Sequence, residues 1–300
     1  MKEGSNTPQK PRRASTVILI REQQRELQVY LLKRSAQSGF MPESYVFPGG
    51  TLDLEDWDSA TWKMHVDMAL GGIVQRLGGG LSEEEVFAHS VAAIRETFEE
   101  AGVFLAHRDE GIKGHLERIC RRRMADGLPG GWLREQVVSE GWTLAFSRLF
   151  RWTHWITPAL RTRRYDTRFF LAFMPRGQEC TPDHTETTHG LWISPEDGLL
   201  GNLRGEVLLS PPTLVTLHEL LQYPDMIILE KEVKDHSWGK ARLPRLIPSP
   251  NGALILLPWD PMHDQEARVD AGVLEETSTS LGEAFSRLWY HEGIWRPVQA

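Results

Sequence analysis

Cysteine is almost absent from this sequence of 300 residues, which also contains no long apolar run and no internal repeat. Its two cysteines, Cys120 and Cys180, are too few for a disulfide framework or a cysteine-based zinc site. No apolar stretch approaches the roughly 18 to 20 residues of a membrane-spanning helix. Residues 1–15 are polar and basic, unlike a secretory leader. These absences predict a cytoplasmic protein with reduced thiols and no membrane partner.

An excess of positive charge is missing as well. The 34 lysines and arginines are outnumbered by 41 acidic residues, and the net charge of -7 argues against generic nucleic-acid binding. With 40% apolar and 25% charged residues, the composition is that of a globular protein and excludes a disordered chain or a coiled coil. A polyanionic ligand would therefore need clustered arginines or a bound cation to reverse the field locally.

Turn residues and hydrophobic patterns predict the order of elements along the chain. Strands are expected at 16–20, 27–32, 45–47, 152–156, 164–174 and 191–193. Helices are expected at 57–70, 82–102, 107–150 with a break at 127–131, 212–222 and 282–290. A hairpin is expected at 246–257, with its turn at 249–252.

The helix at 82–102 carries the clearest start and stop signals. Ser82 is a suitable N-cap, because Glu85 follows three residues later and completes a capping box. Gly102 is a natural C-terminal residue. At about 100° per residue, Glu96, Glu99 and Glu100 fall on one face, and the opposite face is apolar.

Three carboxylates on one helix face repel one another by a few tenths of a kcal/mol per pair. A hard divalent cation such as Mg²⁺ or Mn²⁺ would offset this repulsion with oxygen ligands. The alternative is a solvated face on which Arg95 pairs with Glu99, and the helix alone favours that alternative. The upstream Gly49-Gly50 loop favours the cation, because its bare backbone can offer a carbonyl to the same ion.

These residues resemble the signature of the Nudix hydrolases, Gly-x5-Glu-x7-Arg-Glu-U-x-Glu-Glu-x-Gly-U, where U is bulky and apolar. The second half matches at 95–103, although Thr97 stands where an apolar residue is usual. The first half matches at Gly50, with Asp56 at the x5-Glu position. Gly50 and Arg95 lie 45 positions apart where the signature has 14, so 31 residues interrupt the signature.

Such an insertion is similar to that of the Nudix branch containing coenzyme A and acyl-coenzyme A diphosphatases. The likeness extends over about 14–222 and is carried by 31–35, 39–42, 46–50, 155–158, 164–170 and 211–214. It implies an α/β/α sandwich with a mixed central sheet, and a Nudix domain over 14–262 with helical insertions at about 57–82 and 107–150. A mobile tail at 1–13 and a C-terminal extension at 263–300 complete the expected organisation.

The resemblance also assigns roles to residues of the site. Glu96, Glu99 and Glu100 are implied as carboxylate ligands of Mg²⁺ or Mn²⁺, together with the carbonyl of Gly49. Arg95 is implied to orient the glutamates. A further acid often comes from a distant loop, and Glu186 is nominated as that metal ligand or general base, with a solvated loop acid as the equal alternative.

Arginines supply the local positive charge that a phosphate ligand requires. The candidates are Arg34, Arg161, Arg163, Arg164 and Arg168. Their planar guanidinium groups suit phosphate, although a surface pairing role is the better interpretation for any single member at 161–168. The run at 121–123 is expected on a solvated helix face. The tryptophans of both insertions, Trp132 among them, are interpreted as core packing before pocket lining.

The leading hypothesis is a metal-dependent diphosphatase that splits coenzyme A or acyl-coenzyme A into 3′,5′-ADP and (acyl-)phosphopantetheine. Within the same class, ADP-ribose, NADH or nucleoside triphosphates are the alternative substrates. A non-catalytic nucleotide sensor is a weaker alternative, because degenerate Nudix modules usually lose the glutamates that this chain retains. Residues after 262 either pack on the body or join a homodimer, and the sequence leaves both open.

Overall fold

A computed structural model describes residues 9–39, 41–108, 112–125, 127–249, 252–265 and 279–299. Its central sheet has seven strands. They are β1 (Arg12–Gln23), β2 (Glu26–Arg34), β3 (Tyr45–Val46), β4 (Gly49–Thr51), β7 (Phe150–Ile156), β8 (Tyr165–Phe173) and β9 (Thr187–Ile193). The main path runs β3-β2-β1-β8-β7, with β4 paired to β1 and β9 paired to β2. Only β1 and β8 run parallel among these pairs, so the sheet is mixed as expected.

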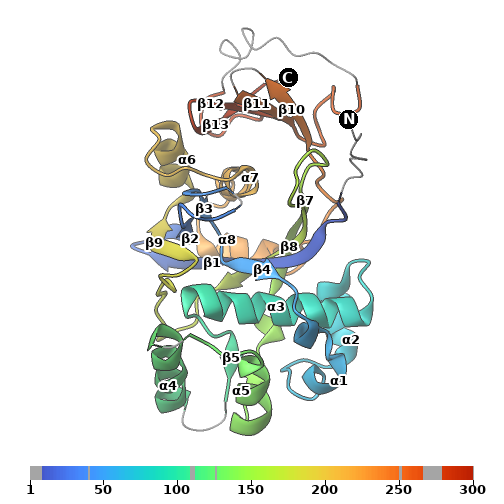
Figure 1. Ribbon diagram of the computed structural model, residues 1–300, viewed down its shortest axis with the longest axis vertical. Coiled ribbons are helices and arrows are strands. Elements are labelled where there is room, and N and C mark those ends of the chain that lie inside the picture. Colours follow the sequence, from blue (N-terminus) through green and yellow to red (C-terminus); the bar gives the residue numbers. More distant parts are fainter. Residues whose placement is uncertain are drawn as a thin grey trace, which may run out of the picture.

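Helix α3 (Glu83–Ala101) crosses one face of this sheet (Figure 1). The predicted capping box is confirmed, because Ser82 Oγ accepts from the Glu85 backbone N–H while the Glu85 carboxylate accepts from the Ser82 N–H. Gly102 ends the helix at a φ of 72°, a left-handed conformation that favours glycine. The apolar face of α3 is fully buried and fixes the opposite, acidic face beside β4.

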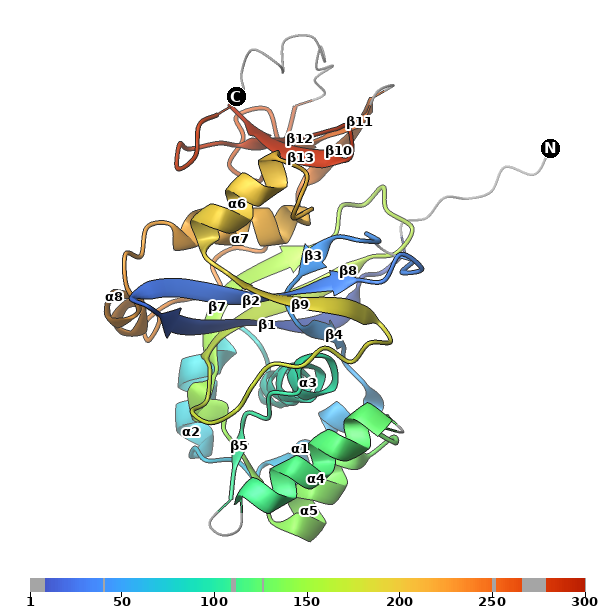
Figure 2. The same ribbon diagram turned by 90° about the vertical axis from the view of Figure 1, so that its left-hand side faces the viewer.

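The other face of the sheet is covered by α6 (Pro195–Leu203) and α7 (Pro211–Leu220), with α8 (Met226–Glu232) beside them (Figure 2). Beyond these helices lies a four-stranded antiparallel sheet. It comprises β10 (Arg245–Ser249), β11 (Gly252–Leu256), β12 (Arg287–His291) and β13 (Ile294–Val298). The central layers form the α/β/α arrangement that the sequence led us to expect.

The first insertion forms several short helical turns instead of the single helix predicted at 57–70. They are η1 (Leu54–Trp57), α1 (Ser59–Trp62), α2 (Leu70–Ile73) and η2 (Val74–Gly78). Asp58 caps α1 by accepting from the Thr61 N–H, and Trp62, the last residue of α1, is buried. The insertion therefore packs through single buried side chains on short helices, not through one continuous amphipathic face.

The second insertion is a helical hairpin of α4 (Ile112–Ala125) and α5 (Trp132–Glu140), separated at the predicted break. Its base is closed by the short strands β5 (Ala106–His107) and β6 (Thr143–Leu144), followed by η3 (Phe146–Arg148). These two-residue strands are too short to leave a pattern in the sequence. Figure 1 shows the hairpin on the side of α3 that faces away from the sheet.

Three expectations at the ends of the chain need correction or comment. The helix predicted at 282–290 is wrong, because 287–291 form β12 and Gly293 turns the chain into β13. Strand β1 begins at Arg12, so 12–13 belong to the sheet and not to a tail, while 1–8 lie outside the described residues. Two residues of the turn predicted at 249–252 also lie outside them.

The four-stranded sheet joins strands from both sides of the boundary predicted at 262/263. Within the ranges given above, every helix is either too short or too polar to cross a bilayer.

Candidate active site

The acidic face of α3 meets the glycine loop at the end of the third strand. The backbone N–H of Gly49 donates to Glu100 Oε2 at 2.8 Å. At Gly50 a Cβ would lie 2.5 Å from the carboxylate carbon of Glu96. A side chain at Gly50 would therefore have to displace the Glu96 carboxylate from this close approach of loop and helix.

Arg95, on the same helix, is held by a buried acid that immediately precedes the first insertion. Its Nε and Nη2 donate to the two oxygens of Asp56 at 3.1 and 2.9 Å, and Nη2 also donates to the Thr51 carbonyl at 2.9 Å. Its Nη1 donates to Glu96 Oε1 and to Glu99 Oε2, each at 2.9 Å. Arg95 thus fixes two of the three glutamates, the orienting role that the resemblance implied.

Asp56 is nearly inaccessible, with 1% of its surface exposed. It closes a capping box in which the Asp53 N–H donates to Asp56 Oδ2 at 2.7 Å. Burial raises the pKa of Asp56, although hydrogen bonds from Arg95 oppose the rise. The insertion starts after this residue and leaves it in place beside Arg95.

Glu99 faces the second insertion, a contact that the sequence did not reveal. Trp132 Nε1, at the start of α5, donates to Glu99 Oε1 at 2.6 Å. The indole ring is buried against Phe98 and Phe104, with centroids 4.9 and 5.8 Å apart. Trp132 is therefore both a core residue and a partner of a predicted catalytic carboxylate.

Negative charge in this cluster exceeds what Arg95 neutralises. Burial, together with Glu99 and Asp56, raises the pKa of Glu96 to about 8 against the opposing effect of Arg95. Burial and the neighbouring Glu96 raise the pKa of Glu100 well above its usual value. An added cation would relieve both effects, so the donor set suits a hard divalent ion.

The carboxylates are not drawn together around one point. Among the described residues, no group of three or more histidine, cysteine, aspartate or glutamate side chains is arranged to hold a metal ion. Glu96 and Glu100 face the glycine loop, and Glu99 accepts hydrogen bonds from Arg95 and from Trp132 of the second insertion. Glu96, Glu100 and the loop thus fit a cation by chemistry and position, and Glu99 lines the same cleft beside them.

A cleft of about 490 Å³ opens from these glutamates toward the four-stranded sheet. It is lined by the acidic face with Arg95, by the glycine loop, by three further arginines and by several aromatic side chains. These arginines are Arg12, Arg34 and Arg161, and the aromatic residues include Trp155, Tyr165 and Trp295. The cleft therefore pairs an acidic end with a basic and aromatic remainder.

Two predicted site residues lie beside the glutamates, one on a strand end and one on a distant loop. Arg34 and Glu186 both line the cleft, and their charges act on Glu100 in opposite directions. The Ser35 N–H donates to the Glu186 carbonyl at 3.0 Å and so holds the two segments together. The structure thus brings Glu186 to the three helix glutamates.

The predicted arginine cluster is divided by the structure. Arg161 lines the cleft, whereas Arg163 packs its guanidinium against Gly39. Arg164 donates to the carbonyls of Thr157 and Gln9 at 3.1 and 3.0 Å and fastens a turn.

Arg168 lies on the opposite face of the sheet, 5.4 Å from the Trp238 ring centroid. Side chains alternate along a strand, so the neighbouring Thr167 and Phe169 line the cleft and Arg168 cannot. Arg168 is therefore not positioned to bind a substrate in the cleft.

The expectation for the run at 121–123 also needs correction, because Arg123 is buried. It donates to the Thr181 carbonyl and, at 3.3 Å, to the Met124 sulfur. Burial lowers the pKa of Arg123, and nearby Asp183 and other groups oppose the change.

Comparison with known proteins decides the family. The sequence model of the NUDT19 Nudix domain matches residues 72–220. The chain belongs to the Nudix hydrolase superfamily. This Nudix hydrolase is 29% identical over 282 residues to the acyl-coenzyme A diphosphatase NUDT19 of Gallus gallus, covering 80% of this chain and 74% of that protein. It is 28% identical over 291 residues to the human protein of that name, covering 79% of this chain and 72% of that one.

A solved structure supports the fold of this Nudix hydrolase. The crystal structure of a NUDIX hydrolase from Alicyclobacillus acidocaldarius matches with a TM-score of 0.59 and 24% identity, covering 77% of this chain and 99% of that one. This match confirms the expected fold, and the match to the NUDT19 Nudix domain confirms the expected enzyme class. Nudix hydrolases generally use divalent metal ions, in agreement with the donor set described above.

Proposed function

We propose that this Nudix hydrolase is a metal-dependent diphosphatase of coenzyme A and acyl-coenzyme A. Water adds to a phosphorus of the diphosphate, the P–O–P bridge breaks, and 3′,5′-ADP and (acyl-)phosphopantetheine leave. The observation that carries this proposal is the alignment of acyl-coenzyme A diphosphatases over about four fifths of the chain. The intact set of three glutamates beside the glycine loop supports it.

We assign the metal to Mg²⁺ or Mn²⁺, with Glu96, Glu100, Glu99 and the Gly49 carbonyl as its ligands. When bound, the ion would neutralise phosphate charge and lower the pKa of a bound water. Arg95 would keep Glu96 and Glu99 oriented. Glu186 lies close enough to Glu100 to raise its pKa, and we assign it as a further ligand or as the general base.

The remainder of the cleft suits a nucleotide. Arg34 and Arg161 provide guanidinium groups for the diphosphate and for a 3′-phosphate. Trp155, Tyr165 and Trp295 provide rings on which a purine can pack. This division of charge supports a substrate that carries several phosphates next to a base.

The test is a turnover assay with coenzyme A, octanoyl-coenzyme A, ADP-ribose, NADH and nucleoside triphosphates, each with Mg²⁺, with Mn²⁺ and with a chelator. We expect 3′,5′-ADP from the two coenzyme A compounds and no product with the chelator. Glu100→Gln should lower kcat by about a hundredfold or more, since it removes a proposed carboxylate ligand of the metal ion. Glu84→Gln, in the first turn of the same helix, is the matched control and should leave kcat unchanged.

Other outcomes separate the alternatives. Faster turnover of ADP-ribose, NADH or triphosphates would assign a different substrate to the same site. Equally slow turnover of every compound by wild type and Glu100→Gln, with tight nucleotide binding by calorimetry, would make the chain a sensor and refute the proposal.

We retain a single Nudix domain, a cytoplasmic location and a homodimer as predictions.

A further inference from the structure

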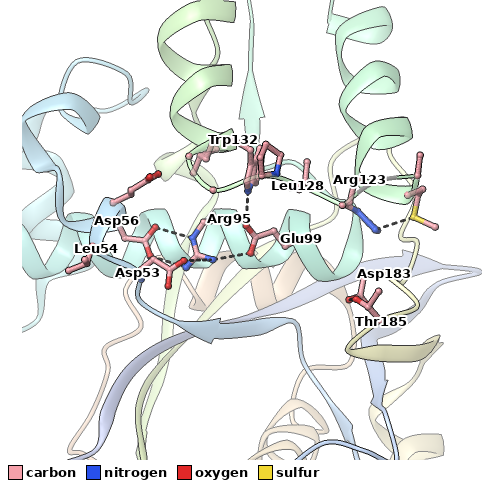
Figure 3. Close-up of a pocket in the computed structure, with 18 of the residues that line it drawn as sticks. Asp53, Leu54, Asp56, Arg95, Glu99, Arg123, Leu128, Trp132, Asp183 and Thr185 are labelled. Atoms are coloured by element: carbon pink, nitrogen blue, oxygen red, sulfur yellow. Dashed lines mark hydrogen bonds and ion pairs between the residues drawn. The ribbon is translucent and has the colours of Figure 1, made fainter.

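A second hollow lies on the other side of Glu99. This hairpin pocket, of about 840 Å³, opens between α3, the first insertion and the α4–α5 hairpin (Figure 3). Asp53, Arg95 and Glu99 line both the hairpin pocket and the cleft. The loop before β9 also serves both, because Asp183 and Thr185 line the pocket and Glu186 lines the cleft. The two hollows therefore meet at the catalytic carboxylates.

The hairpin supplies apolar side chains to this pocket. They are Met124, Leu128, Pro129, Trp132 and Leu133. The turn just before the first insertion and the loop before β9 supply acids instead, namely Asp53, Glu55, Asp56 and Asp183. A phosphate-bearing group placed here would face several carboxylates, which repel it.

The arginines that line the hairpin pocket are engaged elsewhere. Arg95 is surrounded by the carboxylates of Asp56, Glu96 and Glu99. Arg123 donates to a carbonyl and a thioether, and within the described part of the chain its buried Nε has no hydrogen-bond partner. Both guanidinium groups are thus paired or buried, so the pocket offers little to a phosphate and its apolar wall suits an uncharged chain better.

The cleft also has carboxylates, at its end beside α3, but the rest of its wall carries Arg12, Arg34 and Arg161 together with aromatic side chains. We propose that the substrate straddles the carboxylates, with its charged nucleotide arm in the cleft and its uncharged, amide-containing apolar arm in the hairpin pocket. This inference rests on the proposed function. It adds the orientation of the substrate, with the nucleotide side of the diphosphate toward the cleft and the other side toward the hairpin pocket. The α4–α5 hairpin then forms the wall that accommodates an acyl chain.

The test introduces a negative charge into the hairpin pocket and measures the binding of each arm of the substrate separately. Leu128→Glu lies on the apolar wall, and Met124→Glu is a second variant at a residue that is 45% exposed and tolerant of change. Val138→Glu is the matched control, because Val138 is 51% exposed on α5 and lines neither hollow. Thermal melting shows which variants fold.

The assays are kcat/KM for coenzyme A and octanoyl-coenzyme A, and inhibition by 3′,5′-ADP and by octanoyl-phosphopantetheine. Both pocket variants should lower kcat/KM for octanoyl-coenzyme A by about tenfold or more, since each places a carboxylate against the acyl arm. They should weaken inhibition by octanoyl-phosphopantetheine and leave inhibition by 3′,5′-ADP within about twofold. Arg161→Ala should weaken inhibition by 3′,5′-ADP and leave inhibition by octanoyl-phosphopantetheine within about twofold. Val138→Glu should change neither inhibition constant.

The assignment of the arms would be overturned if folded pocket variants weakened inhibition by 3′,5′-ADP alone. It would also be overturned if they weakened inhibition by neither product. Failure of the proposed function is visible earlier and separately, because the wild type would then release no 3′,5′-ADP from either coenzyme A compound.

Discussion

The hydrogen bond from Trp132 to Glu99 couples the second insertion to α3, and Trp132→Phe removes this bond while keeping an aromatic ring. The matched control is Trp142→Phe in the same insertion. Trp142 is buried, its ring lies 5.0 Å from Phe104, and its Nε1 has no hydrogen-bond partner among the described residues. Both substitutions remove a similar apolar area, so the difference between the two variants isolates the hydrogen bond to Glu99.

A hydrogen bond to a charged acceptor contributes about 1.5 to 3 kcal/mol. Urea unfolding should therefore show Trp132→Phe to be less stable than Trp142→Phe by about that amount. Turnover of octanoyl-coenzyme A should fall about tenfold in Trp132→Phe, because Glu99 keeps the hydrogen bond from Arg95 but loses the one from Trp132. Equal stability and equal kcat in the two variants would refute the coupling.

Three further predictions concern burial, close packing and charge. His89 is buried and its pKa is lowered to about 4, chiefly by burial and then by the charge of a nearby arginine, so stability should fall by about 3 kcal/mol as the pH drops from 6.5 to 4. His89→Gln should flatten that dependence in urea titrations. Gly50→Ala should displace the Glu96 carboxylate and abolish most activity in a steady-state assay, while Gly71→Ala, with open space around it, should not. Arg161→Ala should raise KM for coenzyme A about tenfold, and Arg163→Ala, outside the cleft, should leave it unchanged.

Local signals were sufficient for the elements that position the site. The capping box and Gly102 bracketed the catalytic helix, because caps depend on residues a few positions apart. The split signature also brought Gly50 and Arg95 together in the interpretation, although 45 positions separate them. Alternation along β8 could have excluded Arg168, since its neighbours Thr167 and Phe169 line the cleft.

Long-range packing explains what the sequence did not reveal. Trp132 reaches Glu99 only because the α4–α5 hairpin folds back on α3, and no local pattern encodes that contact. Residues 287–291 pair with β11 and β13, and these partners, not local propensity, make the segment a strand. The hairpin pocket arises in the same way from segments far apart in the chain.

The most direct test of the proposed chemistry is mass spectrometry of the products formed from octanoyl-coenzyme A in water enriched in ¹⁸O. With Mg²⁺ or Mn²⁺ we predict 3′,5′-ADP and octanoyl-phosphopantetheine, with ¹⁸O on one phosphate, and loss of both products in Glu100→Gln. Release of octanoate and intact coenzyme A, or no cleavage under any metal, would contradict the account.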